Sequence, residues 1–332
     1  MKIKKLTIQN FKSLININID EPEPFTTFVG PNGSGKSNIF EAIQLAVLPK
    51  RFGSSPQSYI EWINVFGGYE IIKPKSKTKG LLMIKFEDDY KNGYAFIDDF
   101  GEKKLLKNLS GEESSIHSEI SKEKWELLKN CRRLFVGHPE ISKIPDSHSF
   151  LLDGSGSNMV NVLKRLLETE RVKEEIMEWL RIFIPAFDNI SVQVNALNGN
   201  GELAVYEKYI TTPLPSNLIS DGTKNILSIL TAVYQSSEPQ FLCIEEPENG
   251  LHPYVIKELV NLFRQQCEEK GHYIWLNTHS PTLVNQLEAK EIIVVNKNEG
   301  QTTIQQFKNK NFHGLPMDEA WLSNAMGGGV PW

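Results

Sequence analysis

The chain has 332 residues, enough for one large domain or for one domain that carries a substantial insertion. Hydrophobic residues make up 40% and charged residues 23%, which is the balance of a globular protein rather than a disordered one. A formal net charge of −5 argues against a protein built mainly to coat nucleic acid, although net charge does not report a local basic stripe.

Neither the N-terminus nor any internal stretch indicates a membrane or an export route. The basic residues at the N-terminus are followed by no continuous apolar run, so they do not form a signal peptide. No stretch approaches the roughly 18 apolar residues that a membrane span needs. The 3 cysteines are far apart and form no paired metal spacing, which fits a reducing compartment. We therefore expect a soluble, cytoplasmic protein with no membrane partner.

The first fifty residues predict three strands followed by one helix. Apolar residues recur with a period close to two at 13–19, and a short apolar run at 25–30 leads into a glycine-rich loop. A helical apolar face then continues until Pro49, which is expected to end the helix. The predicted elements are strands at 2–8, 13–19 and 25–30 and a helix at 36–48.

The middle of the chain predicts mixed helices and strands. Asn-Gly pairs favour two hairpins, and a long amphipathic pattern predicts one helix over 158–184. Residues 50–80 show no periodic pattern and are expected to be irregular. The remaining predicted elements are hairpins at 81–87/93–99 and 190–196/202–210, a helix around 122–129 and a strand at 132–137.

From residue 217 onward, helices and strands alternate, which predicts a parallel sheet with flanking helices. The two ends of the chain then form one α/β nucleotide domain. The expected division is a core of 1–50 and 211–310, an inserted α+β lobe of 51–210 and a C-terminal tail of 311–332. The predicted elements are helices at 221–235, 253–269 and 281–287 and strands at 241–245, 273–277 and 291–296.

One loop fits the pattern of a phosphate-binding loop: a glycine, four residues, then Gly-Lys-Ser. Glycines let the backbone wrap closely round phosphates, and the N-terminal end of the following helix faces the same anion. Lys36 is expected to contact the β- and γ-phosphates of ATP, and the Ser37 hydroxyl to ligate Mg²⁺. The loop residues are Gly30, Pro31, Asn32, Gly33, Ser34, Gly35, Lys36 and Ser37.

Two acidic residues end a buried strand in the segment FLCIEEPENGLHP, 241–253. Ligands of open α/β sheets gather at that end of the strands. Adjacent carboxylates there are costly unless a cation or a reacting water needs them. Glu245 is therefore expected to hold Mg²⁺, and Glu246 to act as the general base on the attacking water. A solvated acidic turn is the alternative.

Two further segments carry polar residues at the boundary of a strand or helix. His279 follows an apolar strand and could donate a hydrogen bond to the γ-phosphate, although a lone histidine is more often structural. Ser220 and Gly222 stand at a helix start, where a serine can cap the helix and where the backbone forms an anion site. The cap and the anion site are compatible with each other.

In this order the four elements resemble the motif set of the ABC ATPases: Walker A (30–37), signature (219–223), Walker B with a catalytic glutamate (241–246) and switch histidine (279). The opening Asn10-Phe11-Lys12-Ser13-Leu14 looks like that of the SMC, RecF and OLD-type ATPases. The Ser-Asp-Gly-Thr, Glu-Glu-Pro-Glu, Gly-Leu-His-Pro and Thr-His-Ser-Pro segments, with SGSNMVNVLKRL at 155–166, are similar to the ATPases often called AAA15 or AAA-21.

The resemblance implies an α/β P-loop NTPase fold of ABC-head type, with a mostly parallel core sheet and an antiparallel N-terminal β part. It implies that two heads pair head to tail around two ATP molecules. Ser220 and Gly222 would contact the γ-phosphate held by the partner's loop, and Pro247 to Gly250 would lie along the dimer seam. ATP can favour that dimer only by binding it more tightly than the open form.

Some features depart from the family pattern. Glu245 stands where many relatives have Asp, and Gln57 is a weak candidate for the glutamine loop. No heptad run is long enough for a coiled-coil arm. The thirty-five or so residues past the last core strand leave no room for the Toprim nuclease domain of OLD-type proteins, so a nuclease activity would need a partner.

The resemblance favours an ATP-hydrolysing switch or sensor that controls a separately encoded effector such as a nuclease or toxin, in prokaryotic anti-phage defence. A DNA repair or recombination ATPase that binds DNA directly is the main alternative. An ATP-gated scaffold with very slow hydrolysis is a further alternative. A transporter ATPase subunit ranks last, because its signature would read Ser-Gly-Gly-Gln.

Overall fold

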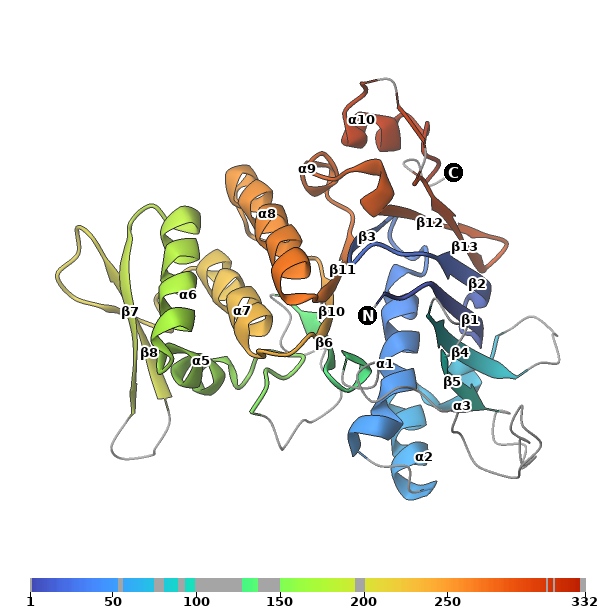
Figure 1. Cartoon of the computed structure of the whole chain (residues 1–332), viewed down its shortest axis with the longest axis horizontal. Coiled ribbons are helices and arrows are strands. Elements are labelled where there is room, and N and C mark those ends of the chain that lie inside the picture. The colour runs from blue at the N-terminus through green and yellow to red at the C-terminus, as the bar shows by residue number, and fades with distance from the viewer. Residues whose placement is uncertain are drawn as a thin grey trace.

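The structure is a computed structural model in which residues 2–52, 56–74, 81–88, 93–98, 127–136, 150–194, 201–308, 310–312 and 314–328 are described. Its centre is a six-stranded sheet with the order β13-β12-β3-β11-β10-β6 (Figure 1). Five of the strands run parallel, and β13 pairs with β12 in the antiparallel direction. The strands are β3 (Phe25–Val29), β6 (Cys131–Phe135), β10 (Phe241–Glu245), β11 (Tyr273–Thr278), β12 (Ile292–Asn298) and β13 (Gln301–Gln306).

The core sheet is buried on both faces because its central strands are apolar at nearly every position. Along β10 the side chains alternate between two hydrophobic cores, with Phe241 and Cys243 in one and Leu242 and Ile244 in the other. Parallel strands covered on both sides read as continuous apolar runs, as this one does. In β10 and β11 the polar residues Glu245, Asn277 and Thr278 stand at the C-terminal ends of the strands, where the site lies.

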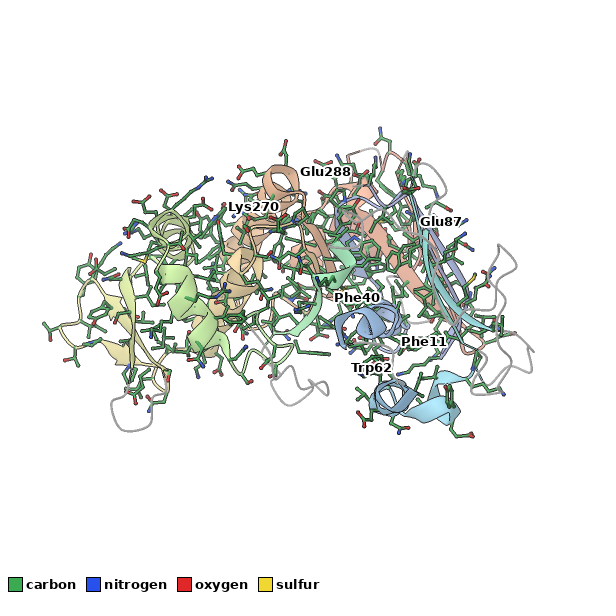
Figure 2. All side chains as sticks on the ribbon, turned by 60° about the horizontal axis from the view of Figure 1, so that its bottom comes forward. Phe11, Phe40, Trp62, Glu87, Lys270 and Glu288 are labelled. Carbon is green, nitrogen blue, oxygen red and sulfur yellow. The ribbon has the colours of Figure 1, made fainter. Side chains whose placement is uncertain are left out.

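The first core lies between the central sheet and an antiparallel sheet with the order β2-β1-β4-β5. Helix α1 (Lys36–Phe52) packs inside it (Figure 1). Figure 2 shows Phe40 on this helix and Phe11 and Trp62 beside it, whereas Glu87, Lys270 and Glu288 lie at the periphery. The strands are β1 (Lys5–Phe11), β2 (Leu14–Asp20), β4 (Leu82–Glu87) and β5 (Gly93–Asp98).

The second core lies on the opposite face of the central sheet. There α7 (Asp221–Tyr234) and α8 (Pro253–Lys270) cover the sheet, and α5 (Met159–Leu167) and α6 (Glu170–Phe183) pack outside them (Figure 1). A three-stranded sheet of β7 (Phe187–Val194), β8 (Gly201–Glu207) and β9 (Leu214–Pro215) closes this end. The remaining short helices are α9 (Pro281–Val284), η2 (Ala289–Glu291) and α10 (Met317–Leu322).

Several predicted element boundaries were wrong. Helix α1 continues past Pro49 to Phe52, since a proline removes only one N–H donor and the buried face of the helix already fixes its course. Residues 50–80 were expected to be irregular, but they contain α2 (Pro56–Val65) and α3 (Gly68–Ile72). The helix predicted at 281–287 ends at Val284. Residues 122–126 of another predicted helix lie outside the described residues, and 127–129 are helical.

The single helix predicted over 158–184 is two helices, α5 (Met159–Leu167) and α6 (Glu170–Phe183). Thr169 takes an extended backbone between them, with φ −96° and ψ 107°, as an N-cap residue does. Each helix buries its own apolar face in the second core. The break lets both faces reach that core, which one straight helix would not do.

The predicted division into core, lobe and tail stays a prediction. The strand pairing shows how parts of the predicted lobe connect to the predicted core. Strands β4 and β5 extend the N-terminal sheet, and β6 forms an edge of the central sheet. Within 51–210, β4 and β6 are therefore hydrogen-bonded to strands of the predicted core, β1 and β10, while β5 pairs with β4. Among the described residues, no helix is long and apolar enough to cross a membrane.

Candidate nucleotide site

The phosphate loop connects the end of β3 to the start of α1, at the carboxyl edge of the central sheet. Gly33 and Gly35 take φ values of +77° and +106°, which side-chain-bearing residues rarely adopt. A Cβ added to Gly30 would lie 2.1 Å from the Val295 carbonyl oxygen, and one on Gly35 would lie 2.1 Å from Thr302 Oγ1. The glycines are therefore needed both for the curvature of the loop and for its close packing on β12 and β13.

Lys36 folds back over its own loop. Its Nζ donates hydrogen bonds to the Gly30 carbonyl at 2.7 Å and to the Pro31 carbonyl at 3.0 Å. Burial lowers the pKa of Lys36, and the charges of Glu246, Glu245 and Glu248 oppose that shift. The Lys36 ammonium is thus hydrogen-bonded to two neutral backbone carbonyl oxygens of the loop. The oxygens of a bound phosphate could replace these two acceptors.

Ser37 and Glu245 meet as the sequence predicts for a cation site. Ser37 Oγ donates to Glu245 Oε2 at 3.0 Å, and Asn277 Nδ2 donates to the same oxygen at 2.5 Å and to Ser37 Oγ at 3.1 Å. Adjacent ligands of an octahedral Mg²⁺ lie about 2.9 Å apart, given ligand distances of about 2.0–2.1 Å. The spacing of Ser37 Oγ and Glu245 Oε2 therefore fits a Mg²⁺ ion that takes its other ligands from phosphate and water.

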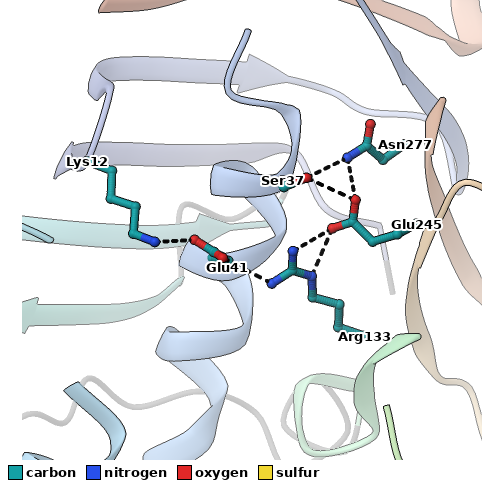
Figure 3. A network of polar contacts seen from close by, with 6 residues as sticks. All are labelled: Lys12, Ser37, Glu41, Arg133, Glu245 and Asn277. Carbon is teal, nitrogen blue, oxygen red and sulfur yellow. Dashed lines mark hydrogen bonds and ion pairs between the residues drawn. The ribbon is translucent and has the colours of Figure 1, made fainter. Parts of the chain in front are cut away.

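Sequence reasoning missed the partner of the other Glu245 oxygen (Figure 3). Arg133 Nε and Nη2 donate to Glu245 Oε1 at 2.9 and 2.6 Å. Arg133 Nη1 also lies 3.6 Å from Glu41 Oε1, and Lys12 Nζ lies 2.5 Å from Glu41 Oε2. The signal in the sequence was an arginine inside the apolar strand 132–137, since a buried cation needs an anion opposite it.

Glu246 and His279 come together at the ends of two neighbouring strands. His279 Nδ1 lies 3.2 Å from Glu246 Oε1, with 45% and 34% of the two side chains exposed. Asn249 Nδ2 donates to Glu246 Oε2 at 3.1 Å, and the Glu246 N–H donates to the Asn277 carbonyl at 2.8 Å. Glu246 is thus partly accessible to water and has a fixed direction, as a general base requires.

Glu248 is a third carboxyl group beside the loop, and the predicted site did not include it. Its side chain is buried, and Thr278 Oγ1 donates a hydrogen bond to its Oε1. Thr278 Oγ1 also accepts a hydrogen bond from the Ser280 N–H at 3.0 Å. Burial raises the pKa of Glu248. These bonds join the segment after β10 to the turn that carries His279.

The signature turn caps α7 and packs on the loop that follows Glu246. Ser220 Oγ accepts a hydrogen bond from the Thr223 N–H at 3.1 Å, so the cap predicted as one alternative is present. A Cβ on Gly222 would lie 2.6 Å from the Gly250 carbonyl oxygen. Asn225 Nδ2 donates to the Asn249 carbonyl at 2.8 Å. Among the described residues, no hydrogen bond joins Ser220 or Gly222 to the phosphate loop.

The N-terminal Asn-Phe-Lys-Ser-Leu segment is connected to the phosphate loop by hydrogen bonds through Ser13. Ser13 Oγ lies 2.7 Å from Thr302 Oγ1, and Thr302 Oγ1 donates to the Ser34 carbonyl at 2.8 Å. Asn38 Nδ2 donates to Ser13 Oγ at 2.8 Å. The side chain of Gln57, the glutamine-loop candidate, lies outside the described residues.

A cavity of about 780 Å³ opens beside Glu246 and His279. Ser155 and Gly156 before α5 and Asp221 and Lys224 in the N-terminal part of α7 also line it. Water can therefore reach Glu246 from this cavity. The start of the 155–166 segment, noted for its resemblance, thus lines the same cavity as the predicted base.

Residues 25–285 match the family AAA_21, described as "AAA domain, putative AbiEii toxin, Type IV TA system". That range contains the phosphate loop, the signature turn, the paired glutamates and His279. The chain belongs to this family. The predicted resemblance to the AAA-21 group is confirmed, and the chain is a member of a P-loop ATPase family.

Two relatives are similar in sequence to this AAA_21 protein over most of its length. An "ATP/GTP phosphatase" of Helicobacter pylori is 23% identical over 335 residues, covering 86% of this chain and 87% of that protein. An "OLD nuclease" of Thermus scotoductus is 23% identical over 344 residues, covering 88% of this chain and 62% of the nuclease. The nuclease thus has a further part to which this sequence does not correspond.

The fold is that of an SMC head. A solved SMC head bound to the C-winged helix domain of ScpA superimposes with a TM-score of 0.53 at 15% identity, covering 91% of this chain and 97% of that one. At that identity the likeness shows the fold alone. The predicted fold class is confirmed: an α/β ABC-ATPase head with a mostly parallel central sheet and an antiparallel N-terminal sheet.

Proposed function

We propose that this AAA_21 protein binds and hydrolyses ATP at the loop between β3 and α1. The contacts of Ser37, Glu245 and Lys36 carry the proposal, because two candidate Mg²⁺ ligands and one cation that could bind phosphate lie together where the phosphate loop meets the end of β10. When bound, Mg²⁺ supplies positive charge to the phosphate oxygens. Ser37 and Glu245 would hold it, and Lys36 would exchange its two backbone acceptors for phosphate oxygens.

Glu246 is the base in the proposed reaction. It accepts a proton from a water molecule, whose oxygen attacks the γ-phosphorus while the bond to the β-phosphate oxygen breaks. His279 donates a hydrogen bond to a γ-phosphate oxygen. Asn249 and His279 hold the carboxylate of Glu246 from two sides, so the base points in one direction before nucleotide arrives.

We further propose that two chains pair head to tail around ATP. Ser220 stands exposed at the start of α7, and among the described residues it makes no hydrogen bond to the phosphate loop of its own chain. Its place at a helix start suits it to an anion brought by a second copy. Gly250, the last residue of the proposed seam loop 247–250, packs on Gly222, and Asn225 Nδ2 donates to the Asn249 carbonyl, so the signature turn lies against that loop.

The proposed role of this cycle is to control a separately encoded effector, such as a nuclease or toxin, in prokaryotic anti-phage defence. The family description names a toxin of a toxin–antitoxin system, and one relative is named a nuclease that is longer than the matched region. Direct binding of DNA is the competing role.

A pull-down from the native operon tests this role. The bait is the Glu246→Gln variant, which should bind ATP without turning it over, and the matched control is Lys36→Ala. We expect an effector protein to be captured by Glu246→Gln with ATP and not by Lys36→Ala. Recovery of DNA in place of a protein, with affinity that falls steeply as salt rises, would favour the repair function instead.

A further inference from the structure

The two carboxylate oxygens of Glu245 have different hydrogen-bond partners. Oε1 receives both N–H groups of Arg133, and Oε2 receives Ser37 and Asn277. Both charged side chains are largely buried, with 6% of Arg133 and 11% of Glu245 exposed. A buried carboxylate whose two oxygens have different partners cannot rotate freely, so Oε2 stays directed at Ser37.

The longer side chain of glutamate makes this arrangement possible. Strands β6 and β10 are parallel neighbours, and Arg133 stands in register with Cys243, two residues before Glu245. The guanidinium therefore approaches Glu245 from the side of β6, while Ser37 approaches from α1 (Figure 3). An aspartate, one methylene shorter, would have to give up one of these two partners.

Arg133 is itself held in place. Its guanidinium lies 4.5 Å from the centre of the Phe135 ring, and Glu41 on α1 lies 3.6 Å from its Nη1. Lys12 in turn neutralises Glu41. The four charges of Lys12, Glu41, Arg133 and Glu245 sum to zero, so the cluster can be buried without a metal.

We propose that Arg133 is a positioning residue for the Mg²⁺ ligand Glu245. It holds Oε1 so that Oε2 stays beside Ser37, and it thereby sets the Mg²⁺ concentration at which nucleotide binds productively. The proposal rests on the proposed ATP site. Partners that orient a metal ligand typically change metal affinity by about 10- to 100-fold when they are removed.

The test is a Mg²⁺ titration of the binding of a fluorescent ATP analogue, in the Glu246→Gln background so that hydrolysis does not interfere. Arg133→Gln removes the charge and the two-pronged contact, whereas Arg133→Lys keeps the charge but not the planar fork. The matched control is Arg132→Gln. Arg132 is the preceding residue of β6, and its Nη1 donates to the backbone carbonyls of Lys129 and Cys131.

We expect the half-saturating Mg²⁺ concentration to rise at least about tenfold in Arg133→Gln and to rise clearly in Arg133→Lys. It should stay unchanged in Arg132→Gln. A second copy of the titration in a Glu245→Asp background should show a smaller effect of Arg133→Gln, because the aspartate cannot use both partners. If Arg133→Gln folds poorly, the Arg133→Lys variant still tests the inference.

Three results would overturn the inference. An unchanged Mg²⁺ requirement in Arg133→Gln, with only a lower melting temperature, would make Arg133 merely structural. A lower requirement would mean that its charge competes with Mg²⁺, and full rescue by lysine would mean that charge alone acts. If the parent binds the analogue no better than a Lys36→Ala control, the proposed ATP site fails instead, which separates the two claims.

Discussion

His279 Nδ1 lies 3.2 Å from Glu246 Oε1, and this contact joins the ends of β10 and β11. Glu246 reaches it with a φ of 47°, in the left-handed region that residues other than glycine seldom occupy. Such strain is common where function fixes a side chain. The turn after β10 thus directs the predicted base at the predicted switch histidine and away from the hydrophobic core.

Replacing Glu246 with Gln should separate nucleotide binding from turnover. The amide keeps the size of the side chain and can still bond Asn249, but it cannot accept a proton from water. We expect ATP binding to persist, phosphate release to fall by about 10²-fold or more, and ATP-bound dimers to accumulate. Phosphate release and light scattering measure the two effects. Unchanged turnover would move the base elsewhere, with Glu245 the next candidate.

The structure changes how the signature turn should be tested. A Cβ at Gly222 would meet the Gly250 carbonyl at 2.6 Å in the same chain, so any substitution there disturbs the chain itself. Ser220→Arg is the better variant because Ser220 is exposed. Ser220→Ala is the matched control, since it loses the same helix cap, at about 1 kcal/mol, without adding bulk.

We expect Ser220→Arg to bind ATP as a monomer but to lose ATP-driven association and hydrolysis, while Ser220→Ala keeps most of both. Mixing Ser220→Arg with Lys36→Ala should restore partial activity, because one of the two shared sites then carries both lesions and the other carries none. Full hydrolysis by a Ser220→Arg protein that stays monomeric would rule out the head-to-tail site.

The buried His272 predicts how stability changes with pH. Burial, followed by the charge of Lys270, lowers its pKa to about 4 from the ordinary value of 6.5. The unfolded chain therefore takes up a proton below pH 6.5 that the folded chain refuses, so stability falls as pH drops from 6.5 towards 4. One such group contributes a slope of about 1.4 kcal/mol per pH unit.

His272→Gln should remove that slope. The glutamine offers an acceptor for the Gln240 N–H, which His272 Nδ1 accepts at 3.3 Å, but it does not titrate. Denaturant unfolding of both proteins between pH 7 and pH 4 measures the difference. If the unfolding free energies of the two proteins change in parallel with pH, His272 does not take up a proton on unfolding.

Short local motifs in the sequence are enough to predict which strand ends carry the candidate site. The phosphate loop, the paired glutamates and His279 each follow an apolar strand, and parallel strands bring such ends together. Arg133 and Asn277 were not predicted, because their roles depend on which strands are neighbours. The alternation of helices and strands does not reveal that order, and β6 comes from the middle of the chain.

The predicted helix boundaries failed for a related reason. The pattern at 158–184 is amphipathic throughout, and only the packing of α5 and α6 into one core decides that the chain turns at Thr169. Residues 50–80 carry few periodic apolar positions, yet Trp62, Ile63 and Ile72 are buried against the first core. Tertiary contacts, rather than local preference, determine the structure there.

The central claim is that this chain hydrolyses ATP with Lys36, and phosphate release by the purified protein tests it most directly. The parent and Lys36→Ala should be compared with saturating ATP and Mg²⁺, alongside equilibrium ATP binding. Lys36 is the cation bonded across the phosphate loop, so its removal should abolish both binding and phosphate release. If Lys36→Ala binds and hydrolyses ATP as the parent does, the loop between β3 and α1 is not the nucleotide site.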